Sequence, residues 1–72
     1  MRPRPWQQVL AALQALGVEA AGESVAHVAI VRGAIVIRTL PKLSMVPSEV
    51  QRSILSSFGI TEQQFLAALP RD

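Results

Sequence analysis

Residues 25–40 read VAHVAIVRGAIVIRTL, and this stretch decides the fold class. Val and Ile dominate it, and β-branched side chains favour strands because they pack well on a pleated surface. The run is interrupted once, at Arg32 and Gly33, where a chain reversal is expected. We therefore predict a hairpin of two strands, residues 25–31 and 34–39, joined by a tight turn whose type the sequence leaves open.

A helix is predicted on the N-terminal side of the hairpin, over residues 5–16. Pro5 suits the first turn of a helix, and Gly17 suits its end. Apolar side chains recur between them at three- and four-residue spacing. This stripe consists of Trp6, Val9, Leu10, Leu13 and Leu16. We interpret the segment that follows, residues 18–21, as a first, short strand.

Two further helices are predicted after a loop over residues 41–46. Ser48 and Gln51 have the spacing of a capping box at the start of the first, and Gly59 suits its end. Thr61 and Gln64 repeat that spacing at the start of the second. The side chains expected to be buried are Val50, Ile54, Leu55 and Phe58 in the first helix, and Phe65, Leu66 and Leu69 in the second.

Together these elements predict one α+β domain over residues 1–72 with the order αβββα(α). Three consecutive strands favour an antiparallel sheet with the helices on one face, which leaves the other face open to bind something. Half of the residues are hydrophobic and 17% are charged, so the composition excludes a disordered chain.

Composition also bears on the compartment. The chain has no cysteine, which excludes disulfides and thiolate metal sites. Its longest nearly apolar run, residues 25–37, is shorter than the roughly 20 residues that cross a bilayer. The basic start leads into an amphipathic pattern rather than a secretory signal. We therefore expect a cytoplasmic protein that does not enter a membrane.

The charge balance leaves the class of partner open. Seven Lys and Arg against five acidic residues give a net charge of +2 and a pI near 10.6, which permits nucleic-acid binding without requiring it. A mean hydropathy of +0.34 in so small a domain predicts apolar side chains on the surface. Such patches mark partner sites, so we expect a protein partner.

His27 is the one side chain whose ordinary pKa lies near neutrality, which makes it the candidate general acid or base. In RNA cleavage it would take the proton of a ribose 2′-hydroxyl, while Lys42 or Arg38 stabilised the charge on phosphorus. Strand alternation places His27 with Ala29 and Val31, away from the core. The alternative is a hydrogen-bonded strand residue with no proton to move.

Other basic residues are candidates for RNA contact. Arg32, Arg38, Lys42 and Arg52 would form a phosphate-contacting surface, or else simply keep the domain in solution. Arg2 and Arg4 lie in a proline-broken tail that would trail over RNA or fray. One histidine without cysteine cannot supply the usual three or four ligands, so we expect no metal and no other cofactor.

Several short motifs resemble the HicA (YcfA-like) family of messenger RNA-cleaving toxins. The matching residues are 16–19, His27, 46–47, 54–55, 59–62 and Phe65. The resemblance implies a fold similar to double-stranded RNA-binding domains, an endoribonuclease activity and a HicB-like antitoxin as partner. Two departures stand out: the family has Gly-Ser before the motif histidine where this chain has Val25-Ala26, and residues 39–43 lack the second histidine that many relatives carry.

Two hypotheses follow. The first is a HicA-like toxin, a metal-independent mRNA endoribonuclease that uses His27 as general acid or base and is neutralised by a HicB-like antitoxin. The second is a non-catalytic module of the same fold that binds a protein or structured RNA. Direct DNA binding is not expected, because Glu62 is the only charge in the last predicted helix and phosphate contact needs cations.

Overall fold

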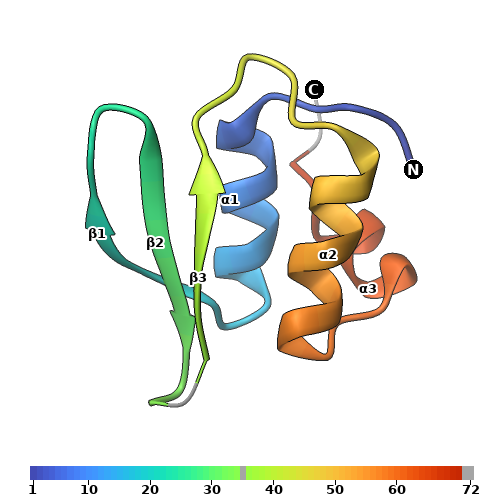
Figure 1. Cartoon of the computed structure of the whole chain (residues 1–72). Helices are drawn as coiled ribbons and strands as arrows, with labels where there is room; N and C mark the ends of the chain where they lie inside the picture. The colour runs from blue at the N-terminus through green and yellow to red at the C-terminus, as the bar shows by residue number, and fades with distance from the viewer. Residues whose placement is uncertain (35, 71–72) are drawn as a thin grey trace.

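The computed structural model describes residues 1–34 and 36–70 and contains three helices and three strands (Figure 1). In chain order these are α1 (Trp6–Ala15), β1 (Glu19–Glu23), β2 (His27–Arg32), β3 (Val36–Pro41), α2 (Ser48–Phe58) and α3 (Glu62–Ala68). The predicted α+β class and the order αβββα(α) are confirmed. All three helices lie on one side of the sheet in Figure 1. None of the helices among these residues is long and apolar enough to cross a membrane.

The sheet is antiparallel throughout, with β2 between β1 and β3. Val28, Ile30 and Leu40 project from it toward the helices and are fully buried. The rest of the core consists of apolar side chains from every helix and from the connecting segments: Val9, Ala12, Leu13, Val18, Val46, Ile54, Leu55, Phe58, Ile60 and Phe65. This one-sided packing leaves the opposite face of the sheet without a layer of helices from the described part of the chain, as predicted.

The strands begin one or two residues later than predicted. Ser24 closes the turn between β1 and β2, since its backbone N–H donates to the carbonyl of His27 over 2.8 Å. Val25 and Ala26 therefore lie in the turn rather than in β2, and Val18 precedes β1 as a core residue. In the β2–β3 hairpin Gly33 adopts a φ of +68°, and Arg32 pairs with Val36. Ile35, inside the predicted third strand, lies outside the described residues.

The helix ends follow two glycines with positive φ. Gly17, at φ +90°, and Gly59, at φ +66°, end α1 and α2 as predicted. After each, the next amide donates back into the helix, Val18 to Leu13 over 3.0 Å and Ile60 to Leu55 over 2.9 Å. These bonds satisfy carbonyls that a helix end leaves unpaired.

The two predicted capping boxes have different outcomes. Thr61 and Gln64 form theirs, with bonds of 3.1 and 2.9 Å. The predicted capping box of Ser48 and Gln51 does not form. The N-cap residue of α2 is Pro47, which makes no side-chain hydrogen bond, and the Gln51 side chain is buried away from the helix start. Leu66 is 45% exposed, so its predicted burial is wrong too.

The N-terminal segment is not a loose tail. Arg4 forms an isolated β-bridge with Val46, with N–H to O distances of 3.2 and 2.6 Å in the two directions. The Arg4 side chain is 8% exposed and bonds to Gln51 of α2. The prediction that Arg4 trails over RNA or frays is therefore wrong. Buried polar groups need hydrogen-bond partners, and the Gln51 side chain finds its partners in Arg2, Arg4 and Val46 instead of at the helix cap.

Candidate functional site

The candidate site is the face of the sheet that no helix covers. We call it the open face and define it by His27, Ala29 and Val31 of β2 and Ile37 and Thr39 of β3. Ala29 lies opposite Thr39 and Val31 opposite Ile37, while His27 pairs with Pro41. The predicted alternation is confirmed, because Val28 and Ile30 between these residues are buried.

The middle of the open face is mainly apolar. Ile37 is 72% exposed, and Val31 and Ala29 beside it are only partly buried. Across β2, Glu19 of β1 lies opposite Val31 and adds one carboxylate at the rim. Exposed large apolar side chains on a regular sheet are a common feature of surfaces that bind another protein.

A shallow depression of about 270 Å³ lies at the His27 end of this face. Its lining is Gly22, Glu23, Ser24, His27, Ala29 and Thr39. Small residues make the hollow, because a side chain on Gly22 would meet the methyl group of Ala29 at 3.9 Å. The His27 side chain is exposed, so its imidazole can be reached from solvent.

Ser24 holds the histidine in place. The His27 N–H donates to the Ser24 hydroxyl over 3.1 Å, and the Ser24 N–H donates to the His27 carbonyl over 2.8 Å. This closed turn sets where β2 begins and hence the face on which His27 stands. Sequence reasoning missed this residue, although a serine just before a strand is a typical turn former. Its hydroxyl lies near the position of the family's missing Gly-Ser, but it is engaged by the backbone.

Arg32 and Arg38, two of the predicted RNA contacts, project on the helix side of the sheet instead. Arg32 donates through Nη1 to the carbonyl of Phe58, the last residue of α2, over 2.8 Å. Arg38 donates through Nη1 to the Ser53 carbonyl over 3.2 Å and to the Ser57 hydroxyl. Arg32 is placed favourably, because a cation at a helix C-terminus meets unpaired carbonyls and the negative end of the dipole.

Lys42 and Arg52 are both held in ion pairs. Lys42 follows Pro41 of β3, so alternation directs its side chain to the helix side. There its Nζ lies 2.7 Å from Glu23 Oε2 and 5.3 Å from the Trp6 ring centre. Arg52 of α2 lies 3.5 Å from Glu62 of α3. Arg32, Arg38 and Arg52 are therefore engaged in the helix layer, whereas Lys42 is paired with Glu23, a residue that also lines the depression beside His27.

This geometry limits what the open face can do chemically. It offers one imidazole, the hydroxyls of Ser24 and Thr39 and the carboxylates of Glu19 and Glu23, and the predicted cation Lys42 is paired with Glu23. A phosphorane carries more negative charge than the phosphodiester, and its formation depends on nearby cations or hydrogen-bond donors. In residues 1–34 and 36–70, no three of the His, Asp and Glu side chains lie close enough together to hold a metal ion.

Comparison with models of protein families, with curated proteins and with solved structures gives no significant match to this chain.

Proposed function

We propose that this protein is a HicA-like domain that acts by binding a protein partner through the open face of its sheet, and not by cutting RNA. The observation that carries the proposal is that exposed apolar side chains and basic side chains lie on opposite faces of the sheet. The apolar residues Ala29, Val31 and Ile37 share one face, while Arg32 and Arg38 project from the other.

A protein partner fits the open face better than RNA does. Nucleic-acid affinity comes largely from cations that displace counter-ions from phosphates. Here the predicted cations satisfy helix carbonyls or carboxylates, and Glu19 at the rim would repel a phosphate. An apolar face gains by losing contact with water, at about 25 cal/mol per Å² of apolar area covered. The partner that the resemblance suggests is a small HicB-like protein.

The test is co-purification with a HicB-like protein encoded beside this chain, using Ile37→Lys as the variant. Placing an ammonium group on the open face costs binding, because the charge must be desolvated. Leu66→Lys is the matched control, since Leu66 is an exposed leucine on α3, 45% exposed and remote from the open face. Loss of co-purification in Ile37→Lys alone supports the proposal. Equal retention by both variants refutes it.

A second candidate function is the metal-independent mRNA endoribonuclease of a toxin–antitoxin pair. The observation that favours it is the exposure of His27 in a depression shared with two hydroxyl-bearing residues. In this reading His27 removes the 2′-hydroxyl proton, and the oxygen displaces the next 5′-oxygen from phosphorus. Induced expression separates the candidates: growth arrest that disappears in His27→Ala supports the nuclease, and equal growth arrest in both refutes it.

A further inference from the structure

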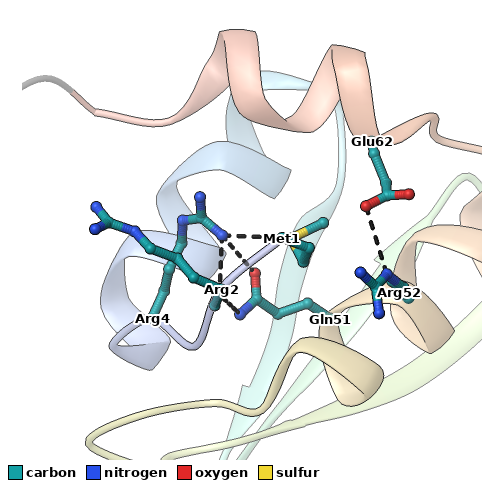
Figure 2. Close-up of polar contacts among 6 residues, drawn as sticks. All are labelled: Met1, Arg2, Arg4, Gln51, Arg52 and Glu62. Carbon is teal, nitrogen blue, oxygen red and sulfur yellow. Dashed lines mark hydrogen bonds and ion pairs between the residues drawn. The ribbon is translucent and has the colours of Figure 1, made fainter.

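The guanidinium of Arg4 is a buried charge whose partners are all neutral. Arg4 is 8% exposed, and its guanidinium carbon lies 5.9 Å from the centre of the Phe65 ring. One nitrogen, Nη1, donates to Met1 Sδ at 3.3 Å, to the Arg2 carbonyl at 3.0 Å and to Gln51 Oε1 at 3.2 Å (Figure 2). Among the described residues, no carboxylate comes within 4.0 Å of this group.

The other two nitrogens of Arg4 are available to a ligand. Nε and Nη2 make no hydrogen bond to the described part of the chain. Among the described residues, every side-chain nitrogen or oxygen that is fully buried has a hydrogen-bond partner. These two nitrogens therefore reach solvent. They form one edge of the guanidinium plane, and such an edge binds two oxygens of an oxyanion in parallel.

Arg2 supplies a second guanidinium at the same place. Burial, and after it the positive charge of Arg2, lower the pKa of Arg4 below its ordinary value, which indicates that the two groups lie within electrostatic range. Figure 2 draws both side chains on the same side of the N-terminal segment. Two like charges beside each other, without a carboxylate, favour an anion between them.

Rigid support distinguishes Arg4 from an ordinary surface arginine. Arg4 is fixed by its bridge to Val46, by Gln51 and by the ring of Phe65, so its edge is presented in one orientation. A phosphate group presents three or more oxygens in a tetrahedral arrangement and carries up to two negative charges. It can therefore bond to both guanidiniums, and its charge matches the two cations better than the single charge of a carboxylate does.

We propose that Arg4 and Arg2 form a binding site for a phosphate group. The site lies where the N-terminal segment meets α2 and α3, in the helix layer, and is separate from the open face. It goes beyond the proposed function and does not depend on it. The phosphate comes either from a free phosphate or from the backbone of a nucleic acid.

The experiment is a titration of the full chain with inorganic phosphate at constant ionic strength, followed through the arginine Nε–H signals by NMR. We expect a saturable shift of the Arg4 signal, with an apparent Kd about tenfold higher in Arg2→Gln because one charge-assisted contact is lost. Arg52→Gln, a change at another exposed arginine, is the matched control and should leave the Kd unchanged. No saturable shift, or an equal Kd in Arg2→Gln, overturns the proposal.

Two further arms complete the test. Acetate at the same concentration should shift the Arg4 signal less than phosphate, and an equal response overturns the preference for phosphate. A short RNA without terminal phosphates identifies the source. If it shifts the same signal and is weakened by Arg2→Gln, the ligand is a nucleic-acid backbone; if only inorganic phosphate does so, the ligand is a free phosphate. Both results support the site.

Discussion

Gln51→Leu tests the buried network that ties the N-terminal segment to α2. The Gln51 side chain is 1% exposed and takes part in three hydrogen bonds. Its Nε2 donates to the Arg2 carbonyl at 2.8 Å and to the Val46 carbonyl at 2.9 Å, and its Oε1 accepts from Arg4 at 3.2 Å. Leucine has nearly the same volume, so the change removes the bonds while it keeps the packing.

The magnitude follows from what each partner keeps. A net hydrogen bond contributes about 1 kcal/mol, or about 2 kcal/mol when one partner is charged, so the three bonds amount to roughly 4 kcal/mol. No partner is left wholly unsatisfied, because the Arg2 and Val46 carbonyls still accept from Arg4. Burial of the leucine side chain returns roughly 1 to 2 kcal/mol. The net loss should be about 2 to 3 kcal/mol.

The assay is urea unfolding followed by the fluorescence of Trp6, the only tryptophan. Linear extrapolation of the urea curve gives the free energy of unfolding directly. In a parallel thermal scan, a loss of 2 to 3 kcal/mol lowers the Tm of a domain of this size by about 10 to 20 °C. Gln14→Leu, an exposed position on α1, is the matched control and should change stability by less than about 0.5 kcal/mol. If Gln51→Leu is as stable as the control, the network does not hold the N-terminal segment and the reasoning fails.

Three other substitutions test local features in the same unfolding assay. Thr61→Ala removes one half of the α3 capping box and should destabilise the domain by about 1 kcal/mol; an unchanged midpoint contradicts the cap. Gly59→Ala places a β-carbon at φ +66° with no atom within 4 Å, so backbone strain alone should cost about 1 kcal/mol, and a stabilised variant would refute that reason. Ile37→Lys, at a side chain that is 72% exposed, should cost less than about 1 kcal/mol while it abolishes partner binding; global unfolding of this variant would show that Ile37 serves the fold.

Local patterns predicted the element order well. Strand residues concentrate β-branched side chains, helix residues repeat their apolar positions, and both signals are contained within short windows. The start of β2 was missed because Ser24 binds the backbone of His27 and so competes with the sheet for the residues between them. The capping box at Ser48 failed for a different reason, since Gln51 has partners 47 and 49 residues away that no window contains.

The candidate site was only half predictable. Alternation along β2 was enough to place His27 on the open face, and it also places Arg32 with the buried Val28 and Ile30, a signal that the sequence contained. Arg38 required the register of β3 against β2, which sets it opposite Ile30. That register depends on the length of the turn, and the turn type could not be derived from Arg32 and Gly33.

Basic side chains and exposed apolar side chains occupy opposite faces of the sheet, which is why we propose a binding role and not RNA cleavage. The basic residues stabilise the ends and sides of α2, where their charge meets carbonyl groups. What remains on the open face is apolar surface with one histidine at its end. A protein partner would therefore bury Ile37 and Val31 and would cover His27 as well.

The most direct measurement is incubation of the purified chain with a labelled mRNA in the presence of a metal chelator, with His27→Ala in parallel. We predict that the RNA stays as intact as in a protein-free control, because Arg32 and Arg38 are bonded to α2 and Lys42 and Arg52 are held in ion pairs. Cleavage by the natural chain that disappears in His27→Ala would contradict it and establish the nuclease.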